Sequence, residues 1–143
     1  MARLTLAQAT TIIENALKKG RQLDCAPLAV AVLDEGGNLK AFAREDGAGI
    51  LRQQIATGKA WGALGMGFGS RTLAKRATDN PAFFAALFAA SQGRLVPAAG
   101  GVLIRDGAGE VLGAVGISGD TSDKDEACAL EGIQAARLTG ETG

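Results

Sequence analysis

The sequence contains no histidine and no tyrosine among its 143 residues. Histidine is the commonest metal ligand and the usual general base near neutral pH, and both residue types can ligate haem iron. Any chemistry must therefore use Lys, Asp, Glu, Cys, Ser, Thr or Arg. The two cysteines, Cys25 and Cys128, are far apart and match no metal-binding or redox spacing, so we predict no metal site.

An excess of charge of either sign is also lacking. Fifteen Lys and Arg residues balance fifteen Asp and Glu residues, so nothing attracts nucleic acid or an anionic membrane. Five Phe residues and one Trp are too few for a base-stacking surface. There is no signal-peptide pattern and no apolar run of the ~18 residues that a membrane span needs. We expect a cytoplasmic protein with free thiols and with neither nucleic acid nor membrane as a partner.

Two similar stretches read as β-hairpins in what we expect to be a single domain over residues 1–143. In the first, strands at 28–33 and 39–44 flank a Gly-containing turn, and in the second the strands are 102–105 and 111–117. Because an isolated hairpin is rarely stable, the two should join in one four-stranded antiparallel sheet, with a fifth strand possible.

Helical patterns lie before, between and after the hairpins. Thr5 and Gln8 form a capping-box pattern for the first helix, and Asn80 precedes Pro81 as a predicted N-cap. The other helices are expected at 50–64, 71–77, 81–91 and 122–138. The sequence therefore predicts an α+β fold in which helices pack on an antiparallel sheet.

Lys59 lies within an apolar arc of the second predicted helix, between Ala56 and Ala60. A lysine on a buried face pairs with an acid, extends its ammonium to solvent, or loses its proton because burial lowers its pKa. The residues leave two interpretations open: a stem lying along apolar surface with its ammonium in water, or a general base or anion-binding group.

Four acidic residues stand at the start of the last predicted helix: Asp120, Asp123, Asp125 and Glu126. Asp120, Ser122 or Asp123 could cap this helix, and carboxylates are favourable at a helix N-terminus. Capping does not explain Asp125, which falls on the apolar arc of the helix. We predict that Asp125 points inward and faces Lys59 across one pocket.

Cys128 and a group of glycines adjoin these acids. Cys128 lies on the inward arc near the helix N-terminus, either as a small apolar residue or as a thiol of lowered pKa. Cys25 is interpreted as a structural or incidental residue. The glycines at the ends of the second hairpin's strands are Gly100, Gly101, Gly116 and Gly119. Glycine there indicates close approach of backbone or ligand, and the N–H groups of 118–120 could hold an anion.

Four stretches, in order, resemble motifs of the GlcG/HbpS family, which is related to the C-terminal domain of PduO proteins. They are "AVAVLDEGGNLKAFAREDGA", "IATGKA", "VPAAGGVLIRDGAGEVLGAVGISG" and "DKDEACALEGIQA". The chain departs from these motifs at Trp61 and Gly62, which follow "KA", and at Leu103, which follows the double glycine.

The resemblance implies a profilin-like domain, haem binding and assembly into symmetric homo-oligomers such as octamers. Motif residues that the resemblance implies for one ligand pocket are Arg44, Asp46, Lys59, Gly100, Gly101, Ser118, Gly119, Asp125, Glu126 and Cys128. Without His and Tyr, the iron ligands left to this chain are Cys25, Cys128, Met1, Met66, hydroxyls and amines.

Three functions are therefore considered. The first is binding of a small ligand or haem in a pocket lined by Lys59 and residues 118–128. The second is a cofactor-independent isomerase, tautomerase or lyase that uses Lys59, Asp125 and Glu126 for proton transfer on a carbonyl or carboxylate metabolite. The third is a non-catalytic oligomeric assembly module.

Overall fold

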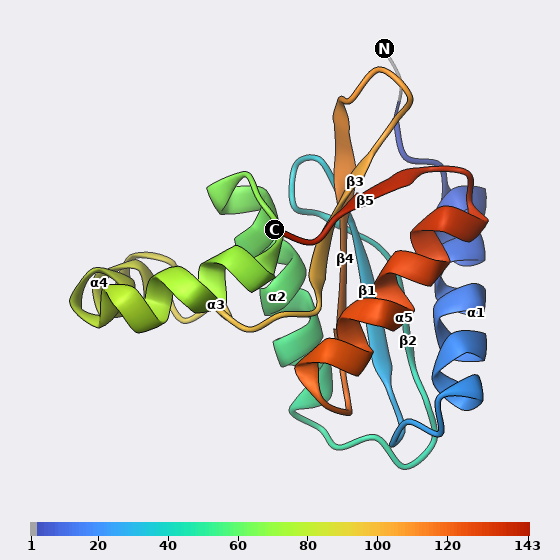
Figure 1. The fold of residues 1–143 in the computed structure, drawn as a ribbon, viewed down its shortest axis with the longest axis horizontal. Coiled ribbons are helices and arrows are strands. Elements are labelled where there is room, and N and C mark those ends of the chain that lie inside the picture. Colours follow the sequence, from blue (N-terminus) through green and yellow to red (C-terminus); the bar gives the residue numbers. More distant parts are fainter. Residues whose placement is uncertain (1–2) are drawn as a thin grey trace.

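The computed structural model describes residues 3–143, shown in Figure 1. Its first helix, α1 (Leu6–Gln22), begins with the predicted capping box. The Thr5 hydroxyl accepts a hydrogen bond from the Gln8 N–H, and the Gln8 side chain accepts one from the Thr5 N–H, both at 3.0 Å. These bonds satisfy N–H groups that a helix start otherwise leaves without partners.

The two hairpins form one antiparallel sheet, as predicted. β1 (Ala29–Asp34) pairs with β2 (Leu39–Arg44), and β3 (Gly101–Arg105) pairs with β4 (Val111–Ser118). β1 and β4 pair at the centre, and β5 (Thr139–Glu141) adds to β3, so the strand order is β2-β1-β4-β3-β5. The α+β prediction is confirmed.

The last helix ends earlier than predicted, and this makes room for β5. α5 spans Ser122–Ala135 rather than 122–138. Arg137 adopts a left-handed conformation (φ 61°), and the Leu138 N–H returns to the Ile133 carbonyl at 3.2 Å. This turn closes the helix and directs the chain back along β3.

Helices cover both faces of the sheet. α1 and α5 pack against the face that carries Val30, Val32 and Ile117. The opposite face, which carries Ala29, Ala31 and Leu33, is covered by α2 (Arg52–Met66). Figure 1 shows α1 and α5 on one side of the strands and α2 on the other. Alternation of side chains along each strand therefore gives two cores, one on each side of the sheet.

α2 lies unusually close to the sheet because small residues form the surface beneath it. A Cβ added to Gly116 of β4 would lie 1.8 Å from the Ala56 carbonyl oxygen. One added to Gly101 of β3 would lie 2.3 Å from the Lys59 carbonyl oxygen. The glycines that the sequence placed in these strands therefore allow a helix backbone to contact the strand backbone.

α3 (Ser70–Asp79) and α4 (Pro81–Ala90) extend away from the sheet (Figure 1). The predicted cap is present, since the Asn80 side chain accepts from the Phe83 N–H at 3.3 Å. α4 has the sequence PAFFAALFAA, without one charged or hydrogen-bonding side chain, yet only Phe84 is buried. Phe83 and Phe88 are 50% and 52% exposed. Among residues 3–143, no helix has both the length and the apolar character that crossing a membrane requires.

Candidate functional site

Lys59 of α2 and Asp125 of α5 meet inside the protein. Their side chains are 3% and 1% exposed, and Lys59 Nζ lies 3.2 Å from Asp125 Oδ2. Nζ also donates to the Ile117 carbonyl at 2.8 Å, and the Asp120 N–H donates to Asp125 Oδ1 at 3.0 Å. The interpretation in which the Lys59 ammonium extends to solvent is therefore wrong, and Asp125 points inward as its place on the apolar arc indicated.

The pair joins helices that lie on opposite faces of the sheet. The Lys59 side chain passes the end of β4 to reach the first turn of α5. Gly100, with φ of 120°, provides the space, because a Cβ there would lie 2.9 Å from Lys59 Nζ. Gly100, immediately before β3, thus leaves room for the side chain of Lys59.

Burial shifts the pKa values of the two groups toward each other. Loss of solvation lowers the pKa of Lys59, and the charge of Asp125 opposes this effect. Loss of solvation likewise raises the pKa of Asp125, opposed by the charge of Lys59. Such a pair can exchange a proton across its hydrogen bond. The cavities described below are, however, lined by residues other than Lys59 and Asp125.

Two polar residues beside the pair carry no clear signal in the sequence. The Ser70 hydroxyl, fully buried, accepts from the Gly101 N–H at 2.7 Å and donates to the Ala98 carbonyl at 2.5 Å. The Arg52 guanidinium donates to the Ser118 hydroxyl at 3.1 Å. Ser70 could have been recognised only as a helix-start residue after Gly69, and its partners lie about thirty residues further along the chain.

The N-terminus of α5 is capped by Thr121, not by Asp120, Ser122 or Asp123 as predicted. The Thr121 hydroxyl accepts from the Lys124 N–H at 3.3 Å. Asp120 is used elsewhere: its carboxylate accepts from the Ala26 and Thr121 N–H groups, each at 2.7 Å, and these bonds hold its pKa below the ordinary value. Of the predicted anion-binding N–H groups at 118–120, that of Asp120 therefore binds the protein's own Asp125 carboxylate.

Gly119 and Glu126 contact other segments. A Cβ on Gly119 would lie 2.3 Å from the Pro27 carbonyl oxygen, so this glycine allows the chain before β1 to approach. Glu126 forms an ion pair at the surface with Arg71 of α3 (Nε to Oε2, 2.9 Å), which Asp123 also contacts. Exposed pairs of this kind contribute little to stability.

Cys128 lies in the core between α1 and α5, in the same apolar cluster as Cys25. Burial raises the pKa of the Cys128 thiol to about 12 and raises that of Cys25 as well. A thiol of this kind stays protonated and is a poor nucleophile or metal ligand near neutral pH. Both cysteines therefore act as small apolar core residues.

Arg44 and Asp46 line a separate cavity of about 480 Å³. Arg44 donates to the Ala48 carbonyl at 2.6 Å, and the neighbouring Glu45 accepts from the Leu28 N–H at 2.8 Å and pairs with Arg21 at 3.0 Å. The ten motif residues thus lie in different places: five gather at the buried pair (Lys59, Gly100, Gly101, Ser118 and Asp125) and the others do not.

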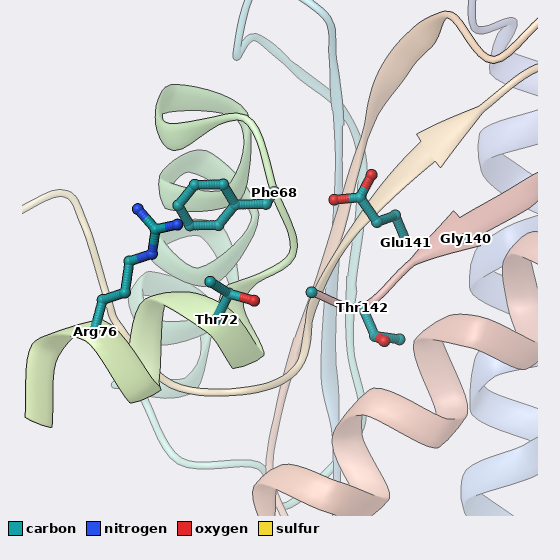
Figure 2. A pocket seen from close by; sticks show the side chains of 7 residues that line it. Phe68, Thr72, Arg76, Gly140, Glu141 and Thr142 are labelled. Atoms are coloured by element: carbon teal, nitrogen blue, oxygen red, sulfur yellow. The ribbon is translucent and has the colours of Figure 1, made fainter. Parts of the chain in front are cut away.

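Another cavity, of about 530 Å³, lies between α3 and β5 (Figure 2). On one wall the Arg76 guanidinium stacks over the Phe68 ring at 4.5 Å. Glu141 and Thr142 form the other wall, and Glu141 pairs with Arg105 at 2.7 Å. In the part of the chain that the structure describes, no group of three or more His, Cys, Asp and Glu side chains could hold a metal ion.

Comparison with known sequences places the motifs in a family. The model of the family described as haem degrading protein HbpS-like matches residues 4–134. An uncharacterized 15.0 kDa protein of Citrobacter freundii, from the dhaT-dhaS intergenic region, is 29% identical over 125 residues. That alignment covers 87% of this chain and 86% of the relative.

Solved structures share the whole fold. The PduOC:haem complex has a TM-score of 0.86 at 25% identity, covering 96% of this chain and 97% of its own. Klebsiella pneumoniae ORFY gives the same TM-score and identity, with coverages of 96% and 93%. A double mutant of Streptomyces reticuli HbpS has a TM-score of 0.79 at 27% identity, covering 94% and 87%.

Proposed function

Because the chain belongs to the haem degrading protein HbpS-like family, we propose that it binds a small ligand and that this ligand is haem or a related porphyrin. The structure of PduOC in complex with haem, whose chain overlies nearly all of this one, supports the proposal. The fold is shared with relatives of differing names, so the residues of this chain must decide where such a ligand would lie.

Met66 is the residue best placed to meet the iron, and its position carries the proposal. It is partly exposed at the end of α2 and borders two cavities, of about 240 and 270 Å³. The Cys25 and Cys128 thiols are enclosed in the core and cannot reach a ligand on the surface. Met1 lies outside the described residues. We therefore place the site at Met66 rather than at Lys59.

The surroundings of Met66 fit the other parts of a porphyrin. Phe83 and Phe84 offer apolar surface for the ring, and Arg76 offers a cation for a propionate. Each cavity is smaller than the roughly 300 Å³ at which ligand pockets begin, so a porphyrin would lie across the surface between α2 and α4. When bound, haem would supply the redox chemistry of its iron, while these side chains would hold and orient it.

Haem binding is tested by titrating the protein with haemin, before and after reduction, and following the Soret band. A thioether is a soft ligand that suits ferrous iron, so the reduced complex should show the larger spectral shift. Met66→Leu, which conserves volume, should abolish that shift. Cys128→Ala should leave it unchanged. An absence of saturable change in the wild type, or a loss confined to Cys128→Ala, contradicts the proposal.

We further propose that a second copy of the chain covers α4, giving a homo-oligomer. An uncharged helix that is apolar on all sides belongs in an interior, yet α4 exposes most of its residues. Because α4 carries no charge, its surface offers a partner only apolar contacts. The same surface on a second copy of the chain can supply matching apolar contacts. The symmetric assemblies that the family resemblance implies, octamers among them, would provide this cover.

Light scattering at micromolar concentration tests the assembly. The wild-type protein should have a mass above that of one chain, and Phe88→Glu should lower it because a carboxylate would be buried without a partner. Lys75→Glu, an exposed change on α3, is the control and should leave the mass unchanged. A wild-type protein that is monomeric, or a Phe88→Glu variant of unaltered mass, overturns the assignment.

A cofactor-independent enzyme ranks behind these functions. The shifted pKa values of Lys59 and Asp125 suit proton transfer, but the Ile117 carbonyl and the Asp120 N–H fill the remaining positions around the pair. A carbonyl substrate would have to displace these groups before it reached the ammonium. Neither residue lines the cavities at Met66, so the pair is better explained as a connection between α2 and α5.

A further inference from the structure

Trp61, which departs from the family motif, borders one of the cavities at Met66 and also lines a separate groove that the proposed haem site does not use. The groove has a volume of about 510 Å³ and lies between the β1–β2 turn, α2 and the segment that follows α4. Trp61 and Leu39 give it apolar surface. The polar lining comes from Gln53, Gln54 and Gln92.

The indole of Trp61 is held in place from two sides. The Arg94 guanidinium lies 4.3 Å from the ring centre, in a cation–π contact. At the β1–β2 turn, Gly37 has φ of 80°, and a Cβ there would lie 3.3 Å from the indole Cδ1 and Nε1. The ring is nonetheless only partly buried, so it presents a fixed aromatic surface to the groove.

Arg94 gives the groove a positive charge without a matching acid. It is the one charged residue in the lining, and among residues 3–143 it forms neither an ion pair nor a side-chain hydrogen bond. A guanidinium binds a carboxylate through two parallel hydrogen bonds. The glutamine amides add both donors and acceptors at the rim.

We propose that this groove binds a planar aromatic carboxylate. The aromatic ring of the ligand stacks with the Trp61 indole, the carboxylate pairs with Arg94, and polar ring substituents bond to the glutamine amides. Each of these three contacts uses one feature of the lining: the fixed ring of Trp61, the cation of Arg94, and the neutral glutamine amides. The absence of acidic side chains from the lining favours an anion over a cation.

The single tryptophan gives the test one reporter, and the Arg94→Gln variant described below assigns its response to the groove, because Trp61 also borders a cavity at Met66. With one Trp in the chain, a ¹⁵N-correlated NMR spectrum contains one indole Nε1–H signal, and that signal reports on Trp61 alone. Nicotinate is the probe, and nicotinamide is its neutral counterpart of the same shape. Nicotinate should shift the indole signal saturably, and nicotinamide should bind about tenfold more weakly because it lacks the charge.

Variants separate this site from the haem site. Arg94→Gln should weaken nicotinate about tenfold. Arg76→Gln is the matched control, because Arg76 also stacks on an aromatic ring, that of Phe68, but lies outside the groove. It should leave the nicotinate-induced shift of the indole signal unchanged. Met66→Leu should also leave it unchanged, so failure of haem binding and failure of this site are distinguishable. The proposal is overturned if nicotinate causes no saturable shift or if nicotinamide binds with equal affinity. It is also overturned if the indole shift depends only on protein concentration, as when a second copy fills the groove.

Discussion

Replacing Asp125 by asparagine should lower the free energy of unfolding by about 3–5 kcal/mol. The substitution keeps the size of the side chain but removes the negative charge that lies 3.2 Å from Lys59 Nζ. The Lys59 side chain is 3% exposed, so water cannot replace the lost partner without local unfolding. Urea-induced unfolding with linear extrapolation measures the change.

The double variant Lys59→Met with Asp125→Leu is the critical comparison. It removes both charges, and apolar replacement of a buried ion pair is often nearly neutral, so much of the stability should return. The Ile117 carbonyl still loses its donor, which limits the recovery. Glu126→Gln, at the exposed pair with Arg71, is the control and should cost less than about 1 kcal/mol. Equal costs for Glu126→Gln and Asp125→Asn would show that the buried pair is not important for stability.

Gly116→Ala should destabilise the protein by about 3 kcal/mol or more, although it adds a single methyl group. That methyl carbon would lie 1.8 Å from the Ala56 carbonyl oxygen, and α2 must move off the sheet to admit it. Neither atom belongs to a side chain that can rotate away. The loss is measured as a lower urea midpoint relative to the wild type.

Gly107→Ala is the matched control for this change. Gly107 lies in the turn between β3 and β4, where an added Cβ meets nothing within 4 Å and φ is not positive. Its substitution should alter stability by no more than about 0.5 kcal/mol. If Gly116→Ala proved as mild as Gly107→Ala, the close contact between α2 and β4 would be incorrect.

The sheet could be predicted because each hairpin is specified by residues that are close together in the sequence. Apolar runs on either side of a Gly-containing turn specify β1 with β2, and again β3 with β4, within about twenty residues. β5 could not be found in this way, since "TGE" is short and contains no apolar residue. Its pairing depends on the left-handed turn at Arg137, a residue type that rarely adopts that conformation.

The buried pair of Lys59 and Asp125 could be predicted from the sequence, but the residues around it could not. A lysine and an aspartate that each fall on an apolar helical arc need partners, and few other candidates exist. Ser70 gives no such signal, because serine at a helix start normally caps its own helix. The grooves at Met66 and Trp61 depend on how side chains from three segments pack, and no local pattern encodes this.

The Lys59–Asp125 contact also bears on how the chain can change over generations. Losing either partner alone leaves a charge without compensation in the interior, while losing both together is far less harmful. A lineage that alters one codon at a time must therefore pass through a poorly folding intermediate to reach the apolar alternative. Purifying selection against that intermediate would preserve the lysine and the aspartate together, even in descendants that had no catalytic use for them.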